Sequence, residues 1–352
     1  MTEPNQLRVV AIGGGTGLST LLRGLKRFVA APIRASAPPS ECKPLPCLIR
    51  ELSAIVTVTD DGGSSGRLRE DLNILPPGDL RNCLVALSED EALLSRLFQY
   101  RFSQGDLEGH SFGNLFLAAL TGITGDFAQA VQTSSQILAT RGRIYPSTTS
   151  NATLSARMDD GSLVHGETNI TASHRSITEL MLSPADAAPL PETLTAIAAA
   201  DLITLGPGSL YTSLITNLLV HGIPEALAAT RATRVYICNL MTQANESLGL
   251  TASQHLEKIL DHARACGLSK HAQIFDYALV NTAPIGPQIL ARYASEGQTP
   301  ILADLDRIRA LGVEPITGNF LHEGDVLRHN YDAVAEAVLH LAQTRVPAAL
   351  SS

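Results

Sequence analysis

A run of glycines near the N-terminus has the composition of a turn that binds phosphate through its backbone. The turn follows an apolar stretch that we expect to be a strand, and Leu18 and further leucines at helical spacing come after it. Glycine permits close approach of the backbone, while free N–H groups and the dipole at the start of a helix favour an anion. Each charge-assisted contact contributes about 1.5–3 kcal/mol, so two or three can hold a phosphate without a lysine. The turn consists of Gly13, Gly14, Gly15, Thr16 and Gly17.

This turn matches neither of the two familiar nucleotide motifs. It lacks the Gly-Lys-Ser/Thr of a Walker A sequence, and Leu18 stands where G-x-G-x-x-G requires its third glycine. A tight packing turn is therefore an equally good interpretation of the run when it is taken alone.

A second glycine turn lies in the other half of the chain and has the same arrangement. It follows the apolar run Leu202 to Leu205 and precedes another apolar segment, so it also links a predicted strand to a predicted helix. Two such turns in one parallel sheet would hold the two ends of one ligand where the strand order reverses. Tyr211, just after the turn, could stack on a base or pack in the core. The residues of the second turn are Gly206, Pro207, Gly208 and Ser209.

A dense group of polar residues follows the second predicted strand. Asp60 lies 47 residues after Gly13, whereas the ribose-binding acid of a dinucleotide fold follows the first glycine by about 20. We therefore predict that Asp60 or Asp61 binds a ribose, a sugar hydroxyl or a hydrated magnesium ion. The turn that follows offers N–H donors to an anion, and a solvated turn capped by the aspartates is the alternative. That turn contains Gly62, Gly63, Ser64 and Ser65.

Two further loops open apolar helices and carry polar side chains. In the first, Asp79 is expected to cap the helix, and Arg81 and Asn82 in its first turn could face an anionic ligand. In the second, which runs into Asn114, His110 could donate to a phosphate or act as a general acid or base. A histidine without an identifiable partner is more often structural, so a packing role is the competing interpretation for His110.

Short apolar runs that alternate with helix-period segments predict an α/β fold. We expect a Rossmann-like, mostly parallel sheet with helices on both faces. The predicted strands are Arg8 to Ile12, Ala54 to Thr59, Leu202 to Leu205, Val235 to Asn239 and Tyr277 to Asn281. The predicted helices are Leu18 to Phe28, Leu80 to Leu87, Leu93 to Tyr100, Asn114 to Leu120, Phe127 to Ala139, Ser253 to Cys266 and Ala333 to Gln343.

Two segments interrupt this pattern within what we expect to be one domain over residues 1–352. Residues 31–46 are rich in proline and are predicted to be an exposed insertion. Residues 144–183 alternate apolar and polar side chains around the turn Asp159-Asp160-Gly161. This alternation predicts an antiparallel excursion, either a β subdomain or the edge of a lid.

The composition excludes several classes of partner. A net charge of -8 argues against nucleic acid, whose binding depends on clustered Lys and Arg, although a local site can still bind a small anion. No run approaches the ~20 apolar residues of a membrane span, and no signal segment is present, so we expect a cytoplasmic protein. The motif H-E-x-x-H is absent, and the five cysteines lack zinc-ligand spacing.

In their order along the chain, these motifs closely resemble those of the gluconeogenesis factors of the YvcK type. That family is related to the 2-phospho-L-lactate transferases of the CofD superfamily. The resemblance runs from Val9 to about Asn330. It rests on IGGGTGLSTLLRGLK from Ile12, TDDGGSSGRLR from Thr59, PPGDLRN from Pro76, GHSFGN from Gly109 and GPGSLYTSLITNLL from Gly206.

The resemblance implies a Rossmann-like fold, a cytoplasmic location and binding of a UDP-sugar such as UDP-N-acetylglucosamine. It also implies a role in cell shape and carbon metabolism during gluconeogenic growth. By motif, the two glycine turns would hold phosphates, and Asp60 and Asp61 would stand at the acidic pair of the transferases. Tyr293 and Arg328 would stack on the base and pair with the diphosphate, with a surface helix and a terminal strand as the alternative for these two.

Two functions remain open on the sequence alone. The favoured one is a regulator that binds a UDP-sugar without turning it over, because nothing on the acceptor side resembles a deazaflavin pocket. The other is a transferase that uses Asp60 or Asp61 with magnesium to move a phosphoryl-linked group. A nicotinamide oxidoreductase is disfavoured by the missing G-x-G-x-x-G. Protein partners and a homo-oligomeric state are left open, and Glu246 is a weaker site candidate because the residues around it depart from the family pattern.

Overall fold

The central element of the fold is a parallel β-sheet. The computed structural model describes residues 6–30, 47–89, 93–173, 175–244 and 246–345, so the predicted proline-rich insertion at 31–46 lies outside the described residues. Within this part of the chain, seven strands pair in the order β10-β9-β8-β7-β1-β2-β3, and every pair is parallel. The strands are β1 (Leu7–Gly13), β2 (Ile49–Val56), β3 (Arg143–Pro146), β7 (Leu202–Leu205), β8 (Thr233–Ile237), β9 (Tyr277–Asn281) and β10 (Glu314–Gly318). The α/β prediction is confirmed.

The strand order reverses between β1 and β7. From β1 the chain continues outward through β2 and β3, and from β7 it continues in the opposite direction through β8, β9 and β10. In an open parallel sheet, the connections that leave such a pair diverge to opposite faces and leave a crevice at the carboxyl ends of the two strands. Both glycine turns therefore begin at this point of the fold.

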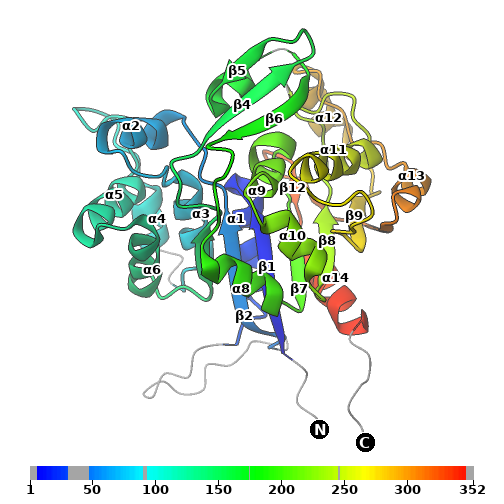
Figure 1. Cartoon of the computed structure of the whole chain (residues 1–352), viewed down its shortest axis with the longest axis horizontal. Helices are drawn as coiled ribbons and strands as arrows, with labels where there is room; N and C mark the ends of the chain where they lie inside the picture. Colours follow the sequence, from blue (N-terminus) through cyan, green and yellow to red (C-terminus); the bar gives the residue numbers. More distant parts are fainter. Residues whose placement is uncertain (1–5, 31–46, 90–92, 174, 245, 346–352) are drawn as a thin grey trace, which may run out of the picture.

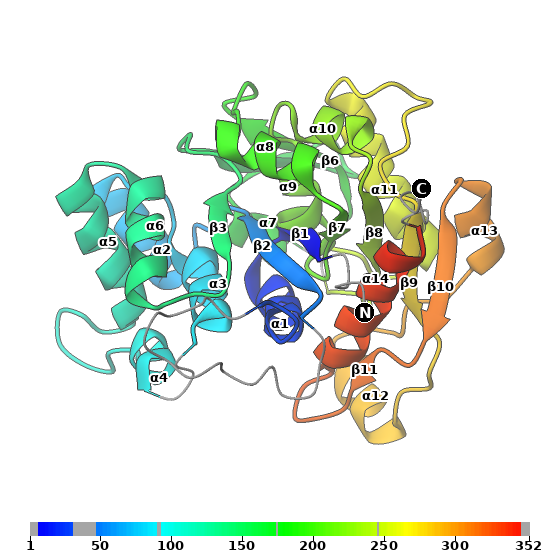
Figure 2. The ribbon, with the colours of Figure 1, turned by 90° about the horizontal axis from the view of Figure 1, so that it is seen from below.

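Helices cover both faces of the sheet because the side chains of each strand alternate between two cores. In β1, Val9 and Ala11 belong to one core, and Val10 and Ile12 belong to the other. The first core contains α1 (Gly15–Lys26), α3 (Gly78–Leu87), α5 (Phe112–Thr124), α6 (Phe127–Ile137) and α14 (Tyr331–Arg345). The second contains α8 (Pro191–Ala199), the π-helical turn η1 (Leu210–Ile215), α9 (Thr216–Leu218), α10 (Ile223–Ala229), α11 (Ala252–Ala265) and α13 (Leu305–Ala310). Figure 2 shows α1 and α14 on one side of the sheet and α8 and α10 on the other.

The antiparallel excursion exists as a three-stranded sheet in the order β5-β4-β6. Its strands are β4 (Thr153–Met158), β5 (Leu163–His165) and β6 (Ile177–Ser183), with the short helix α7 (Glu167–Ala172) between the last two. The predicted hairpin around the Asp-Asp-Gly turn is confirmed, and Figure 1 shows this sheet beyond the upper ends of β1 and β7. The predicted start at 144 is wrong, because Ile144 belongs to β3 and pairs with Ala54 of the main sheet.

Several elements were absent from the predicted set. The group that starts with Gly62 and Gly63 was expected to be a turn, but α2 (Gly63–Leu72) begins there directly. The edge strands β3 and β10 were also missed, as was β11 (Leu321–His322). The surface helix and the terminal strand given as the alternative for Tyr293 and Arg328 are present, as α12 (Pro287–Ala294) and β12 (Arg328–His329), and β12 pairs with β11 in a two-stranded ribbon. The predicted helix beginning at Leu93 is α4 (Leu93–Gln99). In the described part of the chain, no helix combines the length and the apolar character needed to span a membrane.

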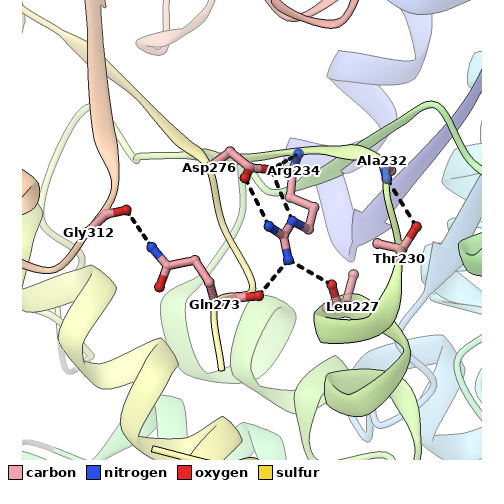
Figure 3. A network of polar contacts seen from close by, with 7 residues as sticks. All are labelled: Leu227, Thr230, Ala232, Arg234, Gln273, Asp276 and Gly312. Atoms are coloured by element: carbon pink, nitrogen blue, oxygen red, sulfur yellow. Dashed lines mark hydrogen bonds and ion pairs between the residues drawn. The ribbon is translucent and has the colours of Figure 1, made fainter. Parts of the chain in front are cut away.

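A buried ion pair fixes the amino ends of β8 and β9, opposite to the crevice. The Arg234 guanidinium donates to both carboxylate oxygens of Asp276, at 3.0 and 2.9 Å, and to the carbonyl oxygens of Leu227 and Gln273. The two side chains are only 10% and 14% exposed. Figure 3 shows the guanidinium enclosed by these partners. Since four of its five N–H donors bind these protein oxygens and the side chain is only 10% exposed, the guanidinium holds the sheet in register and is not available to a ligand.

Candidate functional site

The two glycine turns meet at the carboxyl ends of β1 and β7. A Cβ atom at Gly17 would overlap the carbonyl oxygen of Pro207 and would lie 3.1 Å from the Cα atom of Gly208. No side chain larger than hydrogen fits between the two backbones at this point. The turns therefore open into one space, as the sequence predicted.

That space is a crevice of about 500 Å³. Four parts of the chain surround it: the first glycine turn with α1, the second glycine turn with η1, the loop after β8, and the C-terminal segment around β12. The lining residues are Gly14, Gly15, Thr16, Gly17, Thr20, Pro207, Gly208, Ser209, Ser213, Asn239, Leu240, Met241, Thr242, Gln243, Ala244, Tyr293, Gln298, Leu327, Arg328 and His329. Tyr293 and Arg328, which were predicted from the resemblance alone, lie on its wall.

The first turn is shaped by glycine at two positions. Gly15 has a φ of +59°, a conformation that other residues adopt at a cost. At Gly14 a Cβ atom would lie 2.9 Å from Oδ2 of Asp79 and would overlap the hydroxyl of Thr57. Gly14, at the N-cap position of α1, has no side chain to cap the helix, and the Gly15 N–H donates to the Asp79 carboxylate. The turn thus lies at the start of a helix whose dipole favours an anion.

The second turn is held by amide side chains from neighbouring elements. Asn239 donates to the Gly208 carbonyl oxygen at 2.7 Å, and Gln243 donates to the Ser209 hydroxyl at 3.1 Å. Asn217 is fully buried and donates both to the Gly13 carbonyl oxygen at 3.2 Å and to the Ser213 carbonyl oxygen at 2.7 Å. It thereby ties the end of β1 to the helical segment after β7, which fixes the two turns relative to each other.

Glu246 holds the start of η1 and does not line the crevice. Its carboxylate accepts from the backbone N–H of Tyr211 and from the Thr212 hydroxyl, at 3.4 and 3.1 Å. Burial raises the pKa of Glu246 to about 7, although these two donors act in the opposite direction. The residue is an anchor for the helical turn.

Most of the remaining predicted residues surround a second, smaller cavity. It has a volume of about 160 Å³ and lies where α2, α3 and α5 begin. The structure thus divides the predicted site residues between two cavities. The second cavity is lined by Asp60, Gly62, Gly63, Ser64, Ser65, Gly78, Asp79, Arg81, Asn82, Arg101 and Asn114.

Asp79 stands between the two cavities. Its carboxylate accepts from the Thr57 hydroxyl at 3.2 Å and from the Gly15 backbone N–H, and it also lines the second cavity. Burial raises the pKa of Asp79 to about 6, and the nearby charge of Asp60 acts in the same direction. The predicted capping role is wrong: α3 begins after Pro77 without a side-chain cap, and Asp79 reaches across to the first glycine turn.

The two aspartates of the predicted acidic pair, Asp60 and Asp61, contact different parts of the protein. Asp60 accepts from the Gly62 N–H at 2.9 Å and faces the second cavity. Asp61 points away, toward the antiparallel excursion, where it accepts from the N–H and the hydroxyl of Thr168 at 2.8 and 2.6 Å. In the described ranges, no three His, Cys, Asp or Glu side chains are grouped as ligands of one metal ion. Because Mg²⁺ often uses one or two carboxylates and takes its other ligands from phosphate and water, Asp60 fits such an ion and Asp61 does not.

Two aromatic candidates have structural partners. His110 is buried, its Nδ1 lies 3.1 Å from the Ser64 hydroxyl, and it is behind the wall of the second cavity. Tyr211 is only 1% exposed, and its hydroxyl donates to the Ile177 carbonyl oxygen at 3.1 Å. The base-stacking interpretation of Tyr211 is therefore wrong, because its ring is enclosed in the core and does not face the crevice.

Sequence reasoning missed the polar residues that connect the two cavities and the two turns. Thr57 lies one residue beyond β2, inside an expected strand, and Asn217 lies in a segment that otherwise reads as an apolar helix. A polar side chain in such a segment must find a hydrogen-bond partner, and that requirement was the available signal for Asn217. Nothing local indicated that the partner would be Gly13, about 200 residues away.

The fold and the crevice define a Rossmann-like α/β protein with a polar cleft at the switch point of its sheet. Residues 9–321 match the family model described as 2-phospho-L-lactate transferase CofD. The chain therefore belongs to the CofD family, and within that family to the group named gluconeogenesis factors.

Relatives match this chain over almost all of its length. The gluconeogenesis factor of Halalkalibacterium halodurans is 49% identical, over 94% of this chain and 95% of the relative. That of Bacillus subtilis is 44% identical, over 95% and 98%. A crystal structure of a UPF0052 family member from Bacillus halodurans is 48% identical, with a TM-score of 0.85 over 95% of this chain and 99% of the other. The resemblance seen in the motifs is thus confirmed.

Proposed function

We propose that the crevice binds a nucleotide sugar of the UDP class, such as UDP-N-acetylglucosamine, and that the protein acts as a regulator that does not turn this ligand over. The observation that carries the proposal is the backbone contact between Gly17 and Pro207. It brings the start of helix α1 and a second glycine turn to the same space, which suits a group with several phosphate oxygens.

The size and the chemistry of the crevice support a ligand of this class. About 500 Å³ lies within the range of small-molecule sites, roughly 300–1,000 Å³. The half-buried Tyr293 ring offers an aromatic face for a base, and the Arg328 guanidinium can pair with a diphosphate. Polar side chains such as Asn239, Thr242 and Gln243 are available to sugar hydroxyls.

A metal-dependent transferase is the second candidate. It is favoured by the match to the CofD family model and by Asp60, whose carboxylate lies close enough to Asp79 to raise its pKa. In that case a magnesium ion at Asp60 would neutralise phosphate charge during transfer. Turnover of a nucleotide that requires magnesium distinguishes this candidate from a regulator.

Calorimetry of the full chain with UDP-N-acetylglucosamine, UDP, GTP and NAD, each with and without magnesium, tests the proposal. We expect heat with the uridine ligands and no product. Gly15→Val should abolish binding, because it places a branched side chain at a φ of +59° beside Asp79. The control is Gly122→Ala, in helix α5 away from the crevice, where an added methyl meets nothing within 4 Å. Heat with NAD alone would refute the ligand class.

We further propose that the protein works in the cytoplasm and supports cell shape and carbon metabolism during gluconeogenic growth. The name shared by the relatives supports the metabolic part. A strain that lacks the protein should lose its normal shape on a gluconeogenic carbon source and should grow normally on glucose. Rescue by the wild-type chain and failure of Gly15→Val would link this role to the crevice.

A further inference from the structure

The second cavity, bounded by Asp60, Ser64, Asn82, Arg101 and Asn114, is not explained by the crevice ligand. We propose that it is a separate binding site for a small oxyanion that also carries an O–H group, such as hydrogen phosphate or a phosphate monoester. The site does not depend on which nucleotide, if any, occupies the crevice.

Two ten-residue helices direct their first amides into this space. The start of α2 after Gly62 and the start of α3 after Pro77 both lack a side-chain cap. Uncapped N–H groups at a helix start are satisfied by water or by an anion, and the dipoles of both helices favour negative charge. By contrast, α5 is capped by the Ser111 hydroxyl, which accepts from the Asn114 N–H at 3.2 Å.

Asn114 supplies an independent indication of a ligand. The residue is 2% exposed and lines the cavity, and its amide group donates to the Ser64 hydroxyl at 3.1 Å. Its Oδ1 atom is buried and has no hydrogen-bond partner. A buried acceptor without a partner costs about 1–3 kcal/mol, so an incoming O–H donor would be stabilised there. Because Asn114 Oδ1 needs a donor, an oxyanion that carries a hydroxyl group fits the site better than one without.

Two arginines, Arg81 and Arg101, line the same cavity, and the Arg101 guanidinium also donates to the Gly109 carbonyl oxygen. Burial lowers the pKa of Arg81, and the charge of Arg101 lowers it further. Arg81 donates to the Ser111 hydroxyl at 2.6 Å and to Asn82 at 2.8 Å, while its buried Nε has no partner. The repulsion between the two guanidiniums favours an anion between them, and the charges of Asp79 and Asp60 act on Arg81 in the same favourable sense. Asp60 and Asp79 are the acids on the same wall, and Asp79 loses its charge below about pH 6.

The size of the cavity separates this ligand from the one in the crevice. About 160 Å³ corresponds to roughly five water molecules at about 30 Å³ each, which suits a phosphoryl group and is too small to enclose a whole nucleotide. The Asp79 side chain accepts hydrogen bonds from the Gly15 N–H and the Thr57 hydroxyl, and it stands between the crevice and the second cavity.

Calorimetric titration of the full chain with inorganic phosphate, against chloride at matched ionic strength, tests the proposal. We expect binding in the millimolar range or tighter. Arg101→Gln should weaken it by at least about tenfold, since a charge-assisted contact is lost. Arg96→Gln, on α4 and outside the cavity, is the matched control and should leave phosphate affinity unchanged. Asn82→Asp is a second variant, which keeps the size of the side chain and its contact with Arg81. It adds negative charge to the wall of the cavity and should therefore weaken phosphate binding.

Gly15→Val distinguishes this proposal from the proposed function of the crevice. It should retain phosphate binding, whatever its effect on UDP-sugar binding. Phosphate binding that is lost in Gly15→Val, or that UDP displaces, would place the anion in the crevice and overturn the proposal. No heat with phosphate, equal affinity of Arg101→Gln and Arg96→Gln, or heat with magnesium alone would also overturn it.

Discussion

The backbones at Gly17 and Pro207 are in direct contact, so close that a Cβ atom at residue 17 would overlap the Pro207 carbonyl oxygen. These residues are 190 positions apart in the chain and follow two strands that are neighbours in the sheet. The requirement for glycine at position 17 therefore comes from a tertiary contact. Local turn geometry does not explain it, because Gly17 lies inside α1 and has no positive φ.

Gly17→Ala should damage both stability and ligand binding. The added methyl forces one of the two turns to move, and overpacking of this kind costs about 1–3 kcal/mol. Urea denaturation should show this loss, and calorimetry should show weaker binding of UDP-N-acetylglucosamine. Gly122→Ala should instead stabilise α5 by up to about 1 kcal/mol, since its added methyl meets no other atom. Equal stability of the two variants would contradict the contact.

Inner strands of the sheet were predictable because they are largely buried and read as apolar runs, although β2 begins at Ile49, five residues before the predicted start. The predicted bounds of β7 and β9 match the structure. Edge strands carry fewer apolar residues: Arg143 in β3 and Glu314 in β10 are exposed, and both strands were missed. These two strands are short and partly exposed, so neither forms the continuous apolar run that identified the inner strands.

The turns that form the candidate site could be predicted from the sequence, but their arrangement in space could not. Glycine and serine indicated loops at the ends of strands, and the structure brings two of those loops together as expected. The helix at Gly63 was missed because Gly62, Gly63, Ser64 and Ser65 all have low helix propensity, which tertiary packing overrides. The division into two cavities depends on Asp79, whose contact with Gly15 spans 64 positions and cannot be inferred from local pattern.

Asp79 should make stability depend on pH between about 4 and 6. Its pKa is raised from 3.8 to about 6 in the folded protein, so within this range the folded state retains a proton that the unfolded chain has released. The contribution of Asp79 to stability is therefore largest below pH 3.8, the pKa of the group in the unfolded chain. It falls by up to about 3 kcal/mol as the pH rises through the pKa of the folded protein. Above about pH 6 this contribution stays constant.

Asp79→Asn removes the ionisable group and keeps its shape. We expect the free energy of unfolding of the variant, minus that of the wild type, to increase between pH 4 and 6 and then to level off. Chemical denaturation at a series of pH values measures this difference. The other buried acids affect the stability of both proteins in much the same way, so their effect largely cancels in the difference. A difference that does not change with pH would contradict the raised pKa of Asp79.

The Arg234–Asp276 pair should be far more important for stability than an exposed pair. Arg234→Met leaves the Asp276 carboxylate buried without its charge partner, and breaking a buried pair in this way costs about 3–5 kcal/mol. The matched control is Arg157→Met, because Arg157 and Glu179 are 50% and 51% exposed and such pairs contribute about 0–1 kcal/mol. Urea denaturation of both variants provides the comparison. Similar losses in the two would contradict the role assigned to the network in Figure 3.

The two tyrosines that the sequence predicted for the site should respond to mutation in different ways. Tyr293 lines the crevice, so Tyr293→Ala should weaken UDP-N-acetylglucosamine binding about tenfold or more, since stacking of a base on an aromatic ring contributes about 1–3 kcal/mol. Tyr293→Phe keeps the ring and loses only the hydroxyl, which accepts from the Leu327 N–H at 3.1 Å, so most of the affinity should remain. Tyr211→Phe removes the donor to the Ile177 carbonyl oxygen and should cost about 1 kcal/mol of stability with no change in affinity. Calorimetry measures the affinity of each variant, and denaturation measures its stability, so together they separate the two roles. If Tyr293→Ala binds the ligand as well as the wild type does, the base does not lie on that wall and the orientation proposed for the nucleotide is wrong.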